Sequence, residues 1–292
     1  IQNGRITINK APLSVVANNV SRPFGSPNPT LTGTITGVKN GENITASFTT
    51  TAVQTSNVGT FAITAAAVFS PAALSANYIT TLTNGTLTIT AVPLTIAANN
   101  QTVVLNGTLA NSATYSGFVL GQTPANLAGT LNCSSNGSTI GTHTITCSGQ
   151  SSTNYSITFV PATETVTYAP VGTCAAGPGH QILAPIAVNG TTVFTRATTA
   201  TIPIQFRVCD ARGTAVSSAV VSSFTLLQRI TGGVTTTLNQ PQSTAFAFQG
   251  GAQDWLLNLS TSTPTNLAAG STYVYQIGLN DGTSITFQFS MQ

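Results

Sequence analysis

The sequence predicts an all-β protein of three tandem immunoglobulin-like β-sandwich modules with an extra N-terminal strand. Runs in which apolar and polar residues alternate recur along the chain, which is typical of strands with one buried face. Threonine, a residue that favours strands, makes up about 18% of the 292 residues. A block of about 81 residues occurs twice, and this length suits a small sandwich module better than a solenoid unit.

We divide the chain into four segments. Residues 1–10 are an orphan closing strand, and residues 11–90 and 91–169 are two repeats of one sandwich. Residues 170–292 are a third sandwich, because the repeat pattern stops after Pro170 and a stretch rich in Gly, Pro and Ala follows.

The N-terminal segment copies the end of the first repeat. Asn84-Gly85 is followed, after seven residues, by Pro93-Leu94 at the start of the second repeat. Asn3-Gly4 is followed by Pro12-Leu13 after the same interval. Residues 3–9 therefore correspond to a closing strand whose own module is not among the two repeats.

This orphan strand, with Gly4 at its start, has Ile6 and Ile8 on one face. Burying both isoleucines contributes roughly 3–6 kcal/mol, and pairing along an open sheet edge adds backbone hydrogen bonds. We expect the strand to insert into a neighbouring copy of the chain and to complete that copy's C-terminal module. Head-to-tail repetition of this contact produces an open filament. The alternative is a leftover strand that packs on its own chain or on a crystal neighbour.

The two repeats match over several stretches. Pro12–Asn19 returns as Pro93–Asn100, and Val58–Thr64 returns as Ile140–Thr146. Each copy consists of short alternating runs separated by Gly, Asn or Pro, which predicts strands joined by turns. A single turn of helix is expected at residues 70–75.

The last segment contains two strand signals. Ile202–Asp210 is an alternating run, and Pro203 suits the start or the edge of a strand. Tyr273–Leu279 and Ser284–Phe289 flank Asn280–Thr283, which contains the Asp-Gly pair typical of a hairpin turn.

The four cysteines have no Cys-x-x-Cys spacing, and three pairings are open to them. We favour Cys133 with Cys147, which closes a stretch rich in Gly, Ser and Asn. Cys174 with Cys209 then ties the start of the third segment to the strand at residues 202–209. Four free thiols in a reducing compartment are the alternative, whereas two disulfides predict an oxidising compartment.

Charge is scarce: only 4% of the residues are charged, with 8 Lys+Arg against 5 Asp+Glu. So few basic residues cannot form a phosphate-binding surface, which argues against nucleic acid as a partner. The most apolar stretch, Phe61–Ile79, is interrupted by polar residues and is not a membrane span. Because few groups titrate, we expect stability to change by less than about 1 kcal/mol between pH 3 and pH 9.

No catalytic, cofactor or metal site is predicted. The most enzyme-like set is His180 with Asp210 and a serine, but Asp210 and Asp281 begin turns in which their side chains cap backbone N–H groups. Asp254 precedes Trp255, the expected anchor of the third core. The three aspartates are too far apart in sequence to resemble a calcium-binding loop.

Two further sets of residues in the repeats have structural explanations. His143 stands where the first repeat has a phenylalanine, so we expect it to be a half-buried strand residue. An isopeptide crosslink from Lys10 or Lys39 would need a buried acid beside it, and the acids of the repeats are Glu42 and Glu164.

Both repeats share a Pro-Leu opening strand, a central Gly-Thr-x-x-Ile-Thr strand, an Asn-Tyr pair and a threonine-rich closing strand. By this motif they resemble the MBG family of bacterial surface proteins. The resemblance also implies the pairing of Cys133 with Cys147, since some members of that family carry such a disulfide.

Residues 170–292 contain a second set of motif residues: His180–Leu183, Val193-Phe194, Arg207–Asp210, Trp255 with Asn258, and Leu279–Gly282. By these residues the segment resembles the PxKF family, although Gln205 stands where that family has lysine. Both families are modules of large secreted or surface proteins without assigned catalysis. The resemblances therefore imply a structural role.

The sequence thus predicts a non-catalytic structural subunit of a bacterial extracellular filament, assembled head-to-tail by donation of the N-terminal strand. The alternative is a C-terminal stalk or adhesion fragment of a long modular cell-surface adhesin. A carbohydrate-binding module of a secreted enzyme is less well supported, because the chain has one Trp and six Tyr. We expect a secreted protein at the cell surface, its signal peptide removed, with copies of itself as partners and a surface ligand or glycan as a further one.

Overall fold

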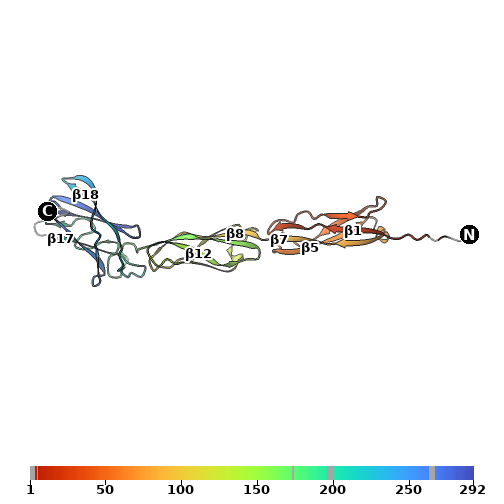
Figure 1. The fold of residues 1–292 in the computed structure, drawn as a ribbon, viewed down its shortest axis with the longest axis horizontal. Helices are drawn as coiled ribbons and strands as arrows, with labels where there is room; N and C mark the ends of the chain where they lie inside the picture. Colours follow the sequence, from red (N-terminus) through yellow and green to blue (C-terminus); the bar gives the residue numbers. More distant parts are fainter. Residues whose placement is uncertain (1–3, 5, 173, 196–199, 263–266) are drawn as a thin grey trace. The chain divides into compact units, whose positions relative to one another are not determined.

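The computed structural model describes residues 4, 6–172, 174–195, 200–262 and 267–292, and its regular secondary structure consists almost wholly of β-strands (Figure 1). The all-β prediction is confirmed. The chain forms two compact units, which do not coincide with the repeats. Unit one comprises Ile1–Ala97, Ala113–Asn132 and Cys147–Val160; unit two comprises Ala98–Ser112, Cys133–Thr146 and Pro161–Gln292.

The first repeat contains two sheets, with strand orders β3-β1-β6 and β2-β7-β5-β4. Its strands are β1 (Ala11–Ala17), β2 (Val20–Pro23), β3 (Gly33–Thr36), β4 (Ile44–Thr49), β5 (Gly59–Phe69), β6 (Tyr78–Thr83) and β7 (Gly85–Thr90). Val15, Ile63 and Leu87 are fully buried and belong to one core cluster. Because these residues come from both sheets, the sheets face each other across one core. A short 3-10 helix, η1 (Ala72–Asn77), lies where one helical turn was predicted.

The second repeat has the same topology, with sheets β10-β8-β13 and β9-β14-β12-β11. Its strands are β8 (Val92–Ala98), β9 (Gln101–Val104), β10 (Ala113–Ser116), β11 (Ala128–Ser135), β12 (Gly141–Ser151), β13 (Tyr155–Val160) and β14 (Ala162–Thr167), with a second 3-10 helix, η2 (Pro124–Asn126). In both repeats the opening strand pairs in parallel with the strand that begins at the tyrosine of the Asn-Tyr pair. The internal repeat seen in the sequence is therefore a repeat of the fold.

The last segment also has two sheets, ordered β15-β17-β21-β20 and β16-β23-β22-β18-β19. Its strands are β15 (Gln181–Ile182), β16 (Val193–Phe194), β17 (Thr201–Arg207), β18 (Val221–Thr231), β19 (Val234–Pro241), β20 (Ala247–Gln249), β21 (Asp254–Ser260), β22 (Ser271–Leu279) and β23 (Ser284–Met291). Strands β22 and β23 form the hairpin predicted around the Asp-Gly turn. Trp255 is buried in the core cluster that both sheets share, as expected for its anchor.

The disulfides agree with the prediction of two bonds. Cys174 is bonded to Cys209, with the two Cα atoms 5.6 Å apart. Cys133 and Cys147 are disulfide-bonded as well, and none of the described cysteines is free.

The N-terminal segment forms no strand over Ile6–Lys10. The side chains of Ile6 and Ile8 are 87% and 91% exposed, so neither packs on the described part of its own chain. Gly4 is exposed too, whereas residues 1–3 and 5 of the predicted orphan strand lie outside the described residues.

Candidate functional site

Within unit one, Asn154 connects the second repeat to the end of the first. Its Oδ1 accepts a hydrogen bond from the Val58 N–H at 3.0 Å, and its Nδ2 donates to Asn57 Oδ1 at 2.9 Å. The ring of Phe24 meets that of Tyr155 edge-on, with centroids 5.8 Å apart. This junction therefore combines two amide hydrogen bonds with an aromatic contact.

The backbone at this junction requires a glycine. Gly25 has φ of +82°, and a Cβ atom there would lie 2.6 Å from Cγ2 of Val119. Tyr155 fixes the opposing loop, because its hydroxyl donates to Gln122 Oε1 at 2.8 Å and accepts from the Val119 N–H at 3.2 Å. The close approach and the positive φ together exclude a larger side chain at position 25.

Within unit two, two aspartates of the last segment bind the end of the second repeat. Asp210 Oδ2 accepts from Asn106 Nδ2 at 2.8 Å, and Asp281 Oδ2 accepts from the Tyr168 N–H at 2.9 Å. The Ala211 N–H donates to the Leu105 carbonyl at 2.9 Å. This second junction is therefore held by charge-assisted hydrogen bonds.

Both aspartates also cap turns, as the sequence predicted. Asp210 Oδ1 accepts from the N–H groups of Arg212 and Thr214, each at 2.9 Å, and Asp281 Oδ1 accepts from that of Thr283 at 3.0 Å. Burial alone would raise the pKa of Asp210, but hydrogen bonds from Asn106, Thr214 and Arg212 hold that pKa below its usual value.

The enzyme-like set proposed from the sequence does not come together. The imidazole of His180 contacts the Ala169 carbonyl at 3.2 Å through Nδ1, and no hydrogen bond joins it to Asp210 among the described residues. No group of three or more His, Cys, Asp or Glu side chains in the described ranges could hold a metal ion.

The second repeat contains a polar row that sequence reasoning missed. In the first repeat, one cross-strand row of β2, β7 and β5 is apolar: Val20, Leu87 and Phe61. In the second repeat, the corresponding row of β9, β14 and β12 is polar: Gln101, Glu164 and His143. His143 is half-buried, as predicted from the position of Phe61.

The centre of this row, Glu164, is 4% exposed, and its Oε2 has no hydrogen-bond partner. The two flanking side chains bind backbone instead. The amide of Gln101 binds the N–H and carbonyl of Ala110 at 3.0 and 2.9 Å, and His143 Nε2 lies 2.7 Å from the Thr139 carbonyl. The row thus combines two side chains that bind backbone groups with one buried carboxyl oxygen, Oε2 of Glu164, that has no hydrogen-bond partner.

Three of the five carboxyl groups are buried: Glu164, Asp210 and Asp254 are 4%, 6% and 5% exposed. The expectation of nearly constant stability from pH 3 to pH 9 rested on how few groups titrate and took no account of burial. The hydrogen bonds of Asp210 lower its pKa in the folded chain, so the stability that this carboxyl group contributes should be lost at low pH.

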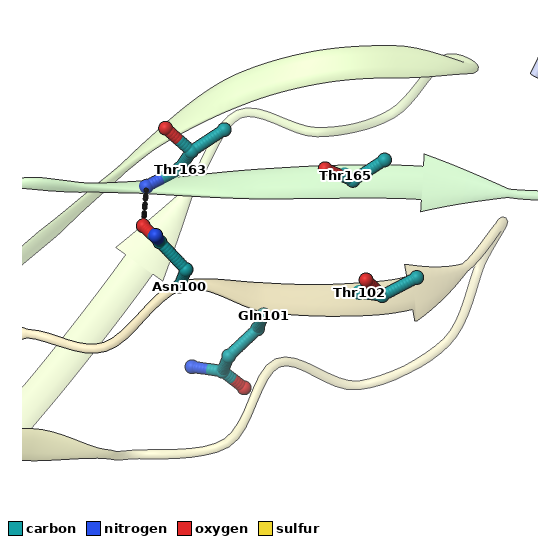
Figure 2. A pocket seen from close by; sticks show the side chains of 5 residues that line it. All are labelled: Asn100, Gln101, Thr102, Thr163 and Thr165. Atoms are coloured by element: carbon teal, nitrogen blue, oxygen red, sulfur yellow. Dashed lines mark hydrogen bonds between the residues drawn. The ribbon is translucent and has the colours of Figure 1, made fainter.

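A shallow hollow lies beside strands β9 and β14 and is lined by neutral side chains: Asn100, Gln101, Thr102, Thr163 and Thr165 (Figure 2). Asn100 Oδ1 accepts from the Thr163 N–H at 2.9 Å. The first repeat has the same contact, from the Thr86 N–H to Asn19 Oδ1 at 2.8 Å. The asparagine is therefore a structural feature of both repeats rather than a sign of a ligand site.

These observations define a class, a protein of tandem β-sandwich repeats whose ends are fixed by side-chain hydrogen bonds. The model of the MBG domain (YGX type) family matches residues 13–88 and 94–165, about half of the chain, and the chain belongs to this family. The predicted tandem MBG repeats are confirmed. No curated protein matches the sequence.

Several solved structures show a weak likeness to this chain. Drosophila N-cadherin EC1-4 is 9% identical, with 98% of this chain and 76% of that chain covered and a TM-score of 0.22. Yersinia pseudotuberculosis InvD is 13% identical, with 95% and 96% covered and a TM-score of 0.25. Scores this low support no argument about function. Among the described helices, none has the length and apolar character needed to cross a membrane.

Proposed function

We propose that this chain is a non-catalytic structural part of a bacterial cell-surface protein, a stalk of MBG repeats that holds other parts of the protein away from the cell. The observation that supports a stalk is the hydrogen-bonded contact at each end of the second repeat. Neighbouring domains move relative to one another unless their interface prevents it. Asn154 at one junction and Asp210 with Asp281 at the other oppose such motion.

The chemistry of the chain also favours an extracellular location. Two disulfides suit an oxidising compartment. A surface dominated by neutral Thr, Ser and Asn, with only 4% of residues charged, interacts weakly with salt. A stalk exposed to a variable medium benefits from both properties.

Residues 170–292 are proposed to be a PxKF-like sandwich that follows the two repeats. Its motif residue Arg207 is 6% exposed, and its guanidinium donates to the carbonyls of Gln253, Ala252 and Pro178 at 2.7, 2.7 and 3.1 Å. The motif arginine thus serves the fold of this segment, in line with a structural rather than a catalytic module.

Intact cells of the source bacterium test this proposal. An added protease should remove the protein from unbroken cells, and non-reducing peptide mapping should recover Cys133 linked to Cys147 and Cys174 linked to Cys209. A protein that is protected until the cells are broken, with reduced thiols, would refute the surface location.

A second candidate is a filament in which each chain donates its N-terminal strand to a neighbouring copy. The observation that favours it is the exposure of Ile6 and Ile8, which alternate as in a strand but have no partner. Negative-stain microscopy of the purified chain separates the candidates. Filaments that vanish when residues 1–9 are deleted would support strand donation, whereas discrete particles with and without these residues would support the stalk.

A further inference from the structure

Residues 4–10 repeat a strand whose place in the fold is known. The shared spacing from Asn-Gly to Pro-Leu aligns Ile6 with Leu87 and Ile8 with Ile89. Leu87 and Ile89 lie in β7 and are 0% and 1% exposed. The two isoleucines are thus the counterparts of two core residues, and both stand in solvent here.

Strand β7 is an interior strand of its sheet. It pairs in parallel with β2 on one side and antiparallel with β5 on the other. Strand β14 has the same two neighbours in the second repeat, β9 and β12. A strand with this pattern therefore fits a slot between two strands rather than a free sheet edge, because both of its backbone edges are paired.

We infer that residues 4–10 are the closing strand of a further MBG sandwich, one that supplies strands equivalent to β2 and β5 with the slot between them open. The inference rests on the proposed function as an array of such repeats. A complete copy of this chain is a poor acceptor, since β7 and β14 already fill this slot in its two repeats. In the last segment, the sheets formed by the described residues are continuous from edge to edge.

An extended chain tests the inference directly. A second copy of residues 11–83 is placed before residue 3 of the full chain, so that residues 3–9 follow it as residues 84–90 follow the first repeat. The amide hydrogens of Ile6, Thr7 and Ile8 should then exchange at least about 100-fold more slowly than in the original chain, because their strand would be paired along both of its edges.

Matched variants identify the side chains that are needed for this protection from exchange. Ile6→Asn with Ile8→Asn should abolish this protection in the extended chain and leave the melting temperature of the original chain unchanged. Thr7→Asn, at the outward position that corresponds to Thr88, should change the protection by less than about threefold. Equal protection in the Ile6→Asn/Ile8→Asn variant would overturn the assignment of these residues to a core.

A reference chain shows whether the added segment can fold in this position. In it, residues 3–9 are replaced by a copy of residues 84–90, so that the added segment has the sequence of a complete first repeat. Folding of this reference, with residues 6–9 of the native extension still exchanging freely, would overturn the proposal. So would protection of these residues in the original chain that rises with protein concentration, since a copy of the chain would then be the acceptor. Neither result depends on where the protein is located, so a failed surface location leaves the strand assignment intact.

Discussion

The two repeats have the same arrangement of strands but differ in the residues at corresponding core positions. Tyr78 of the first repeat accepts from the Lys39 N–H at 2.9 Å and donates to Glu42, just as Tyr155 joins the corresponding loop of the second. The strand order and the hydrogen bond from a loop N–H to this tyrosine hydroxyl are thus the same. These features fix the fold in both copies.

The core rows are not the same. Leu87 of the first repeat corresponds to the buried Glu164 of the second. Two residues along β2 from Val20, Arg22 of the first repeat is 4% exposed and donates to Asn28 and to the Val53 carbonyl at 2.7 and 2.6 Å. The second repeat has Val103 at this position. The same strand framework therefore accommodates an exchange of apolar for polar residues, and at Glu164 the cross-strand neighbours Gln101 and His143 are polar too.

The largest effect should come from placing an acid in the first repeat, at the position of Glu164, without the polar neighbours that Glu164 has. Leu87→Glu places a carboxyl group in a core whose neighbours Val20 and Phe61 remain apolar, so the first repeat should lose at least about 4 kcal/mol of unfolding free energy. Urea unfolding of the full chain, followed residue by residue by hydrogen exchange, measures the loss. Thr88→Glu, on the outward face of the same strand, is the control and should cost less than about 0.5 kcal/mol. A similar small cost for Leu87→Glu would mean that the row tolerates an acid without its polar neighbours.

The disulfide of the second repeat should have the next largest effect. The first repeat has Ala65 where the second has Cys147, and it folds without a bond there. Replacing Cys133 and Cys147 with alanine opens a loop of 15 residues and should lower the stability of the second repeat by about 3 kcal/mol. Hydrogen exchange should show the loss in the second repeat, with the first repeat's interior strands unchanged. Equal loss in both would show that the repeats unfold together.

The reverse exchange should stabilise the protein. Glu164→Leu removes a buried, unpaired carboxyl oxygen and gives the second repeat the residue that the first repeat has, so its unfolding free energy should rise by about 1–3 kcal/mol. Glu164→Gln keeps a buried polar group and should show a smaller gain. Destabilisation by leucine, measured by urea unfolding, would instead mean that the carboxyl group supports its neighbours Gln101 and His143.

Much of the fold could be predicted from the sequence because strands and turns depend on local patterns. The alternation around Ile63 and Ile145 sets which side chains face the core, and the Asp-Gly pair at Asp281 fixes the last hairpin. The repeats made these local signals stronger, since each appeared twice.

The polar row and the junctions could not be predicted from local sequence patterns. Glu164 lies among Thr163 and Thr165, so a polar residue on each side hides that it faces the core. The strand pairing shows that Glu164 occupies the position that Leu87 has in the first repeat. Only this correspondence reveals that its side chain faces the core. The junction partners of Asp210 and Asp281 lie 104 and 113 residues away in sequence, and no local pattern links them.

The junctions offer a smaller test of the comparison. Asn77 of the first repeat corresponds to Asn154 of the second, but its side chain is exposed. Asn154→Ala removes the acceptor of the Val58 N–H and should cost about 1 kcal/mol, seen as an approximately fivefold faster exchange of the Val58 amide. Asn77→Ala is the matched control and should leave that amide unchanged. An equal response to both would show that Asn154 has no special role at the junction.

The smallest effect concerns pH and separates the two junctions. The contact in unit one uses the neutral amides of Asn57 and Asn154, whereas that in unit two uses Asp210, whose pKa is held below its usual value. A carboxyl group with a lower pKa in the folded chain stabilises it above the unfolded-state pKa of about 3.9, and this contribution is lost as the pH falls through the folded-state pKa. Asp210→Asn should therefore reduce stability at pH 6. The effect should shrink as the pH falls from about 4 through the folded-state pKa, because the native side chain is neutral below that pKa. Exchange of the Thr214 amide, corrected for its intrinsic pH dependence, reports this contact, while the Val58 amide serves as the acid-insensitive reference. If acid opened both sites equally, the loss would come from unfolding of the whole chain rather than from this carboxylate.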